Sequence, residues 1–160
     1  MIDWTALESP LSEPPRFYVQ APDGIKDWSE DARQVAFFTM LHRVAPKVMA
    51  HHVKNEGNYN HAKAAKSGVV SGVLDIGVYA EFPLAAVIEM KGYTKAGVAG
   101  KLSPQQIKWG NKLFDRGWPV ACFFCPYAAL RWLREQGFPV GEFVESPRVQ
   151  SKVSTRRKVK

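Results

Sequence analysis

Hydrophobic residues recur along the chain with periods that predict both helices and strands. Residues 27–46 carry apolar side chains at helical spacing, at Val35, Phe37, Phe38 and Leu41. This segment is therefore predicted to form a helix with one face in the core. Ser29 suits its N-cap, the acids Glu30 and Asp31 follow in the first turn, and Pro46 ends it.

Short apolar runs predict strands at 47–53, 68–80, 84–92 and 118–124. Only three residues separate the second run from the third, so these two are expected to form a hairpin or adjacent antiparallel strands. Further helices are expected at 103–117 and 126–137. The first of these has Ser103 as N-cap, Pro104 at its first position and Gly117 as its stop. The order of elements predicts an α/β fold, a central mixed sheet flanked by helices.

The length and composition suit one domain. The chain has 160 residues, and 46% of them are hydrophobic, enough for a core. We expect a single domain over residues 1–146, in which 1–28 are irregular and 54–68 form a loop or broken helix. The final segment, 147–160, holds six Lys/Arg and no acid, and is predicted to be a disordered basic tail that favours polyanions or only aids solubility.

The rest of the chain excludes several classes of protein. Outside the tail, 16 Lys/Arg face 15 Asp/Glu, so the body is nearly neutral. No stretch approaches the ~18 apolar residues of a membrane span, and the N-terminus lacks a signal-peptide pattern. Cys122 and Cys125 have no second Cys/His pair at zinc spacing. We expect a cytoplasmic protein with two free thiols.

Charged residues interrupt two predicted strands and point to chemistry. Glu89 and Lys91 are two residues apart, so in a strand they project from the same face. Asp75 stands among apolar residues, where a carboxylate is costly without a compensating partner. Pairing of the two strands would bring Asp75 beside Glu89. Two such carboxylates suit Mg²⁺ or Mn²⁺, and the lysine could orient or deprotonate an attacking water or stabilise charge on phosphorus.

A purely structural role is the alternative for the same residues. Asp75, Glu89 and Lys91 would then form a salt-bridge set at the edge of a sheet. Glu-x-Lys alone occurs by chance in many proteins. The upstream aspartate, in an apolar strand with glycines on both sides, favours the functional interpretation.

Three segments together resemble a nuclease family. They are "GVLDIGV" at 72–78, "VIEMKG" at 87–92 and "GKLSPQQIKWGNKLFDRGWPVACF" at 100–123. In this order they resemble the virus-type replication-repair nuclease (VRR-NUC) family of the PD-(D/E)XK restriction-endonuclease-like superfamily, and specifically its compact phage-type members. The similarity covers about residues 30–137, with "NEGN" at 55–58 as a further match. Leu74 departs from the pattern, since many members have proline there.

The resemblance implies a role for each matching position. Asp75, Glu89 and the backbone carbonyl of Met90 would bind Mg²⁺ or Mn²⁺, and Lys91 would act on the attacking water. Gln106 would hold Lys91 or a phosphate with its amide. The family also uses a glutamate on the first helix, for which Glu30 is our choice and Glu56 the other candidate for a supporting acid. An acid such as Glu30 also stabilises a helix N-terminus without any catalysis.

Basic residues outside this set are candidates for contacts with DNA. Lys95 and Lys101 lie in a Gly-rich loop without acids, predicted to be mobile and to touch phosphates, or else to be only a connector. Lys63 and Lys66 could line a DNA path, and Arg156 and Arg157 lie in the basic tail.

Together with this resemblance, the sequence predicts a metal-dependent endonuclease that acts on DNA in the cytoplasm of a bacterial or phage-infected cell, in association with the nucleoid. By resemblance it would act on branched DNA, in the manner of a Holliday-junction resolvase, and would form a homodimer whose two sites face opposite strands. Two other classes stay open, a nucleic-acid-binding module with the same fold but no turnover, and a structural or partner-binding protein.

Overall fold

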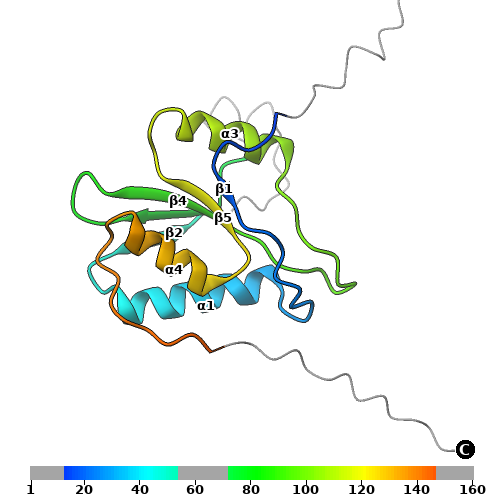
Figure 1. Ribbon diagram of the computed structural model, residues 1–160, viewed down its shortest axis with the longest axis horizontal. Coiled ribbons are helices and arrows are strands. Elements are labelled where there is room, and N and C mark those ends of the chain that lie inside the picture. The colour runs from blue at the N-terminus through cyan, green and yellow to red at the C-terminus, as the bar shows by residue number, and fades with distance from the viewer. Residues whose placement is uncertain (1–12, 54–71, 147–160) are drawn as a thin grey trace, which may run out of the picture.

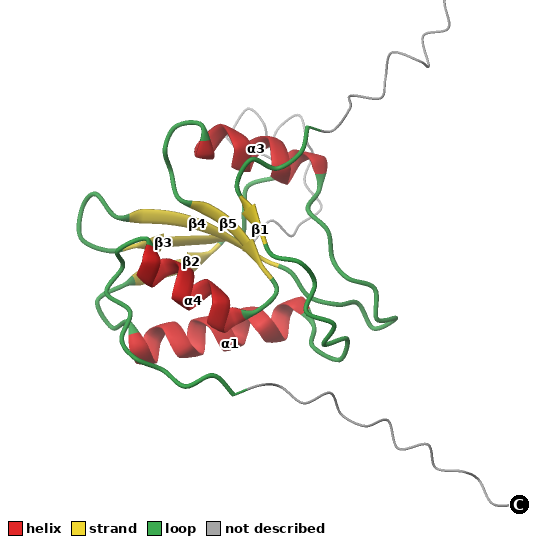
Figure 2. Ribbon diagram, in the orientation of Figure 1, coloured by secondary structure: helices red, strands yellow, loops and turns green. Residues whose placement is uncertain are grey.

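A five-stranded mixed sheet forms the centre of the structure, a computed structural model that describes residues 13–53 and 72–146. The described helices cover both of its faces, with α1 and α4 packed together on one face and α3 on the other (Figures 1 and 2). This is an α/β fold, as predicted. The strands are β1 (Tyr18–Val19), β2 (Met49–His52), β3 (Ile76–Tyr79), β4 (Ala85–Met90) and β5 (Val120–Phe123). The helices are α1 (Glu30–Val44), α3 (Pro104–Phe114) and α4 (Pro126–Glu135).

The strands lie in the order β1-β5-β4-β3-β2. The pairs β2–β3 and β3–β4 are antiparallel, which confirms the predicted pairing of the second and third apolar runs. The chain crosses over through α3 before β5 returns parallel to β4. The longest strand, β4, is thus central and is paired on both sides.

The alternation of side chains along the strands divides the core between the two faces. Toward α1 and α4, the sheet buries Ile76, Val78, Ile88, Met90 and Phe123 against Phe37, Leu41, Leu130 and Leu133. Toward α3, a smaller cluster joins Val120 and Cys122 to Phe17 and Leu74, with Trp109 and Leu113 packed against it. The polar side chains described below also project from the α3 face of the sheet.

Both serine caps form as predicted. The Ser29 hydroxyl accepts a hydrogen bond from the Ala32 amide, and the Ser103 hydroxyl accepts one from the Gln106 amide. The side chain of Gln106 in turn accepts from the Ser103 amide, which completes a capping box. Gly117, with φ of +83°, follows α3 in the left-handed region that glycine adopts without strain.

Two sequence predictions about the fold are wrong. Residues 1–28 were expected to be irregular, but Tyr18–Val19 form β1 and pair in parallel with β5. Val35 was expected in the core, but it is 65% exposed, and the buried stripe of α1 runs through Arg33, Phe37 and Leu41 instead. Strand β1 was missed because two residues are too few to show a periodicity. The buried face of α1 was misassigned because it includes an arginine, which the hydrophobic pattern does not count.

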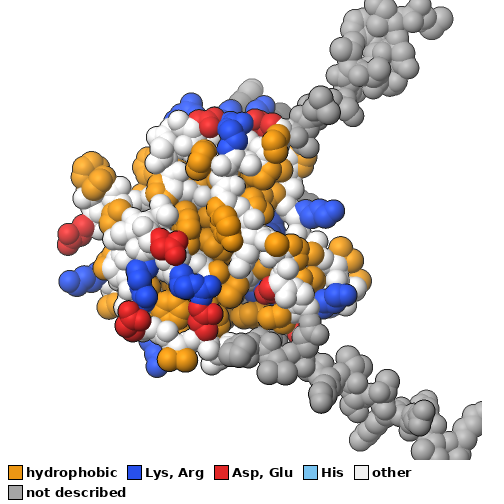
Figure 3. Space-filling model, in the orientation of Figure 1, with side chains coloured by type: hydrophobic (Ala, Val, Ile, Leu, Met, Phe, Trp, Pro, Cys, Tyr) orange, Lys and Arg blue, Asp and Glu red, His pale blue; other side chains and the backbone are white. Residues whose placement is uncertain are grey.

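The surface of the body mixes charges of both signs. Figure 3 shows basic and acidic side chains interspersed on the face it presents. Arg131 pairs with Glu145, and Arg134 pairs with Glu142. Among the described residues, no helix combines the length and apolar character needed to cross a bilayer.

Leu41 and Val35, on different sides of α1, predict effects of different size on stability. Leu41→Ala removes a side chain that is 0% exposed and leaves a cavity against α4 and the sheet. We expect it to lower the free energy of unfolding by about 2–5 kcal/mol. Val35→Ala, on the exposed side of the same helix, should change it by less than about 0.5 kcal/mol. Chemical denaturation of both variants measures the difference, and equal losses would contradict this account of the core.

Candidate metal centre

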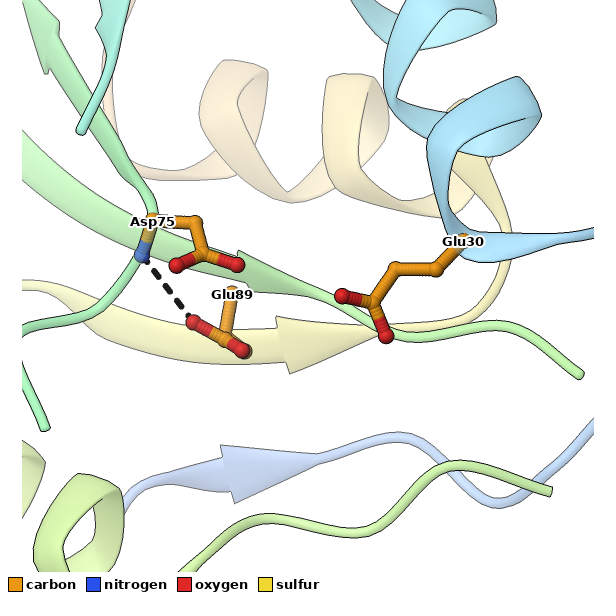
Figure 4. Close-up of side chains that lie close together, drawn as sticks. All are labelled: Glu30, Asp75 and Glu89. Atoms are coloured by element: carbon orange, nitrogen blue, oxygen red, sulfur yellow. Dashed lines mark hydrogen bonds between the residues drawn. The ribbon is translucent and has the colours of Figure 1, made fainter. Parts of the chain in front are cut away.

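Three carboxylates come together from three separate elements. Asp75 directly precedes β3, Glu89 lies next to the last residue of β4, and Glu30 begins α1. The register pairs Ile76 with Ile88, which brings Asp75 beside Glu89 as predicted. Figure 4 shows the three side chains directed toward one common space. One carboxylate oxygen from each residue lies within 4.8 Å of the others.

The carboxylate of Glu89 is the buried centre of this group, since the residue is 0% exposed. One of its oxygens, Oε2, accepts a hydrogen bond of 3.0 Å from the Asp75 amide (Figure 4). The other, Oε1, accepts one of 2.6 Å from Lys91 Nζ and one of 2.6 Å from Gln106 Nε2. A buried carboxylate needs such partners because desolvation alone makes it costly.

The structure corrects the partner of Gln106. We expected its amide to hold Lys91 or a phosphate, but it donates to Glu89 and accepts from the Ser103 amide. Both ends of the amide are therefore engaged. The residue links the start of α3 to the end of β4 and fixes the orientation of the Glu89 carboxylate.

Burial raises the pKa of each of the three acids above the ordinary value for its residue type. For Glu89, desolvation is the main cause and the negative charge of Asp75 adds to it, against the attraction of Lys91. For Asp75, desolvation again leads, and the charge of Glu30 adds to it. For Glu30, desolvation leads and the charges of Glu89 and Asp31 contribute. For each acid, burial thus disfavours the ionised form more than the neighbouring partners favour it.

Lys91 carries the positive charge of the site. Desolvation would lower its pKa, but the nearby carboxylates of Glu89, Glu30 and Asp75 outweigh this and raise the pKa above its usual value. Its Nζ also lies 3.9 Å from Glu30 Oε2. Lys91 is therefore an ammonium ion near neutral pH in the metal-free protein. In this form it can orient a water or stabilise negative charge, but it cannot accept a proton.

The donor set fits a hard divalent cation. Three carboxylates face a single ammonium group, so the fully ionised site has an excess of negative charge. Oxygen donors of this kind suit Mg²⁺ and Mn²⁺. Glu30, Asp75 and Glu89 could each offer one oxygen to such an ion. Met90 ends β4, and its side chain is buried on the opposite face of the sheet, so only its backbone could contribute; that assignment remains a prediction.

Arg33 holds together the segments next to Glu30, and its role was not predicted from the sequence. Its guanidinium is fully buried, and it donates to both carboxylate oxygens of Asp23 and to the carbonyls of Trp28, Ile25 and Phe124. It therefore ties the segment before α1 to the end of β5. The signal in the sequence was an arginine four residues before Phe37 and eight before Leu41, a position on the core stripe of the helix.

The Gly-rich loop after β4 forms a hydrogen-bonded hairpin beside the site. Tyr93 pairs with Ala99, and the Gly100 amide donates to the Gly92 carbonyl. Lys95 and Lys101 are exposed on this hairpin. A Cβ atom built on Gly97 would lie 3.4 Å from Lys26 Cδ, so Lys26 also packs along the hairpin. The sequence analysis missed Lys26 because it lies some 70 positions away along the chain.

The structure does not test the remaining predicted acid and four of the predicted basic residues. Glu56, Lys63 and Lys66 lie outside the described residues, as do Arg156 and Arg157. Glu30 is the predicted supporting acid that the structure places at the cluster. Cys122 and Cys125 are free thiols, as expected, and burial raises the pKa of Cys122 to about 12.

Comparisons with protein-family models, with curated proteins and with solved structures give no match for this chain.

The raised pKa values predict how the stability of the metal-free protein depends on pH. A carboxyl with a higher pKa in the folded state binds protons on folding, so its contribution to stability is lost as pH rises from its ordinary value through its raised value. We therefore expect the melting temperature in EDTA to fall as pH rises above the ordinary carboxyl pKa values of 3.8 for Asp75 and 4.5 for Glu30 and Glu89. The fall should be smaller in Asp75→Asn, which relieves the repulsion.

The matched control for this prediction is Asp115→Asn. The Asp115 carboxyl is exposed, and its hydrogen bonds to Arg16 hold its pKa below the usual range. Its contribution to stability is present above its ordinary pKa and is lost only at lower pH, so the variant should follow the wild-type profile over this window. Parallel profiles for Asp75→Asn and the wild type would count against the repulsion within the site.

Proposed function

We propose that this protein is a metal-dependent endonuclease that hydrolyses phosphodiester bonds in DNA. The observation that carries the proposal is the convergence of Glu30, Asp75 and Glu89 around Lys91 at one end of the central strand. These side chains come from the positions that resemble the VRR-NUC pattern. We assign the fold to the PD-(D/E)XK restriction-endonuclease-like class on the same grounds.

The residues divide the work according to their charge and contacts. Asp75, Glu89 and Glu30 would hold Mg²⁺ or Mn²⁺, which when bound supplies positive charge to the phosphate and acidifies the attacking water. The Lys91 ammonium, held 2.6 Å from Glu89, would orient the water and stabilise charge that develops on the phosphate oxygens. Gln106 would keep Glu89 in the orientation that the ion requires. In-line attack would leave 5′-phosphate and 3′-hydroxyl ends.

The substrate we propose is branched DNA. This rests on the resemblance to compact phage-type members of the family, which resemble junction resolvases. A homodimer would present two sites to opposite strands of a junction. Light scattering of the purified protein tests the dimer independently of cleavage.

Cleavage assays test the proposed activity directly. Labelled four-way junction, flap and duplex DNA are incubated with the protein in Mg²⁺, in Mn²⁺ and in EDTA. We expect metal-dependent cutting, fastest on the junction, and a loss of about 100-fold or more in Lys91→Ala and Glu89→Gln. Lys47→Ala is the matched lysine control, because Lys47 lies with Glu81 and Leu84 near the β3–β4 turn, at the far end of β4.

The same assay separates the two alternatives. A folded protein that binds DNA without cutting it would support the nucleic-acid-binding module. A folded protein that neither binds nor cuts would reduce Asp75, Glu89 and Lys91 to a structural ion-pair cluster. Circular dichroism of each variant shows whether lost activity reflects lost structure.

The hairpin lysines predict a change in salt dependence. Lys95 and Lys101 are exposed beside the site, and each is expected to contact one phosphate. Lys95→Ala and Lys101→Ala should each reduce the slope of log K against log salt by about 1. Binding is measured in EDTA by fluorescence anisotropy over a salt series, again with Lys47→Ala as control. An unchanged slope in both hairpin variants would place the DNA elsewhere.

A further inference from the structure

At Gly92, the chain just after β4 lies in close backbone contact with the start of α1. A Cβ atom built on Gly92 would lie 2.2 Å from the Glu30 nitrogen and 2.6 Å from the Glu30 Cα and from the Ser29 carbonyl carbon. All three contacts are with backbone, which cannot turn aside as a side chain can. Gly92 is not among the described glycines with positive φ, so the conformation of its own backbone does not require glycine. What requires glycine is the space.

The contact at Gly92 lies in the middle of a packed junction. The Tyr93 amide donates to the Trp28 carbonyl over 3.3 Å, and the Gly92 carbonyl accepts from the Gly100 amide over 2.8 Å. Arg33 stacks on the Trp28 ring at 4.6 Å and donates a hydrogen bond to the Trp28 carbonyl. The first turn of α1 is therefore pressed against the residue that follows Lys91, with bonds on both sides of the contact.

This approach determines whether Glu30 reaches the other two carboxylates. Asp75 and Glu89 are joined by strand pairing and by a hydrogen bond between them. Glu30 has no such link and lies on a helix, and its carboxylate comes within 3.9 Å of Lys91 Nζ. A helix displaced to accommodate a side chain at position 92 would carry Glu30 away from the cluster while leaving Asp75 and Glu89 paired.

We propose that Gly92 is a positioning residue that sets the reach of Glu30 to the metal. This inference rests on the proposed function, in that it takes the three carboxylates to bind a divalent cation. According to this inference, Glu30 completes the set of metal ligands only because the backbone contact at Gly92 holds it in place. If Gly92 had only a structural role, its substitution would lower stability but would leave the contribution of Glu30 to metal affinity unchanged.

A double-mutant cycle between Gly92 and Glu30 tests the inference. Mn²⁺ affinity is measured by titration calorimetry for the wild type, Gly92→Ala, Glu30→Gln and the double variant. We expect each single change to weaken binding about tenfold or more. The double variant should bind no more weakly than Glu30→Gln, because the two changes remove the same ligand. Losses that multiply in the double variant, or unchanged affinity in Gly92→Ala, would overturn the inference.

A matched glycine control separates stability from metal affinity. Gly117 follows α3 with φ of +83° and has no atom within 4 Å of a built Cβ. Gly117→Ala should therefore lower the melting temperature through backbone strain and leave Mn²⁺ affinity unchanged. Weaker Mn²⁺ binding in this variant would show that general destabilisation is enough, and would count against a specific role for Gly92.

A second variant keeps the inference testable if Gly92→Ala does not fold. Glu30→Asp retains an acid in the first turn of α1 but shortens the side chain by one methylene group. If the backbone contact fixes the distance, Glu30→Asp should lose Mn²⁺ affinity about as much as Glu30→Gln. Wild-type affinity in Glu30→Asp would mean that α1 adjusts freely, and the inference would fail. A wild-type protein that binds no Mn²⁺ would instead refute the proposed function on which the inference rests.

Discussion

The buried carboxylate of Glu89 is the interaction on which the rest of the site depends. Its three donors come from three places: the Asp75 amide before β3, the Lys91 side chain after β4, and the Gln106 amide in the first turn of α3. Loss of any one donor would leave a fully buried charge under-compensated, at a cost of several kcal/mol. The strand register, the end of β4 and the start of α3 are therefore coupled through one side chain. The capping box extends this coupling, because the Gln106 side chain that completes the box with Ser103 is also the one that orients Glu89.

The site is held in an unfavourable electrostatic state by a fold that is well packed elsewhere. Burial and mutual repulsion raise the pKa of Glu30, Asp75 and Glu89, although the charge of Lys91 and the hydrogen bonds to Glu89 act in the opposite direction. On the other face of the same sheet, α1 and α4 bury a continuous apolar core. That core provides the stability that the charged cluster lacks. Concentrated strain of this kind in an otherwise consistent fold is typical of functional sites.

Sequence reasoning was reliable where a feature depended on nearby residues. The period of two along β4 placed Glu89 and Lys91 on one face, the short connection before β4 predicted the pairing that brings in Asp75, and serine caps located α1 and α3. It failed where a feature depended on residues far apart in the chain. Strand β1 exists only through its pairing with β5, Arg33 is buried only because its partners surround it, and Gln106 finds Glu89 through the packing of α3 on the sheet. The space required at Gly92 is invisible for the same reason, since α1 begins some 60 residues earlier.

The segment after β4 contains both the backbone contact at Gly92 and the lysines for which we propose contacts with DNA. Gly92 lies against the start of α1, and the hairpin that follows presents Lys95 and Lys101 to solvent, with Lys26 packed along it. These parts are joined by the hydrogen bonds across the hairpin and by the Arg33 network, so they form one hydrogen-bonded unit. Under the proposed function, this one stretch of backbone would position both the lysines that contact phosphates and the Glu30 carboxylate that reaches the metal. Contacts with the flanking phosphates would then hold the reacting phosphate in a fixed position relative to the carboxylates. Orienting the reacting groups before the reaction lowers the barrier, because less freedom of movement is lost in reaching the transition state.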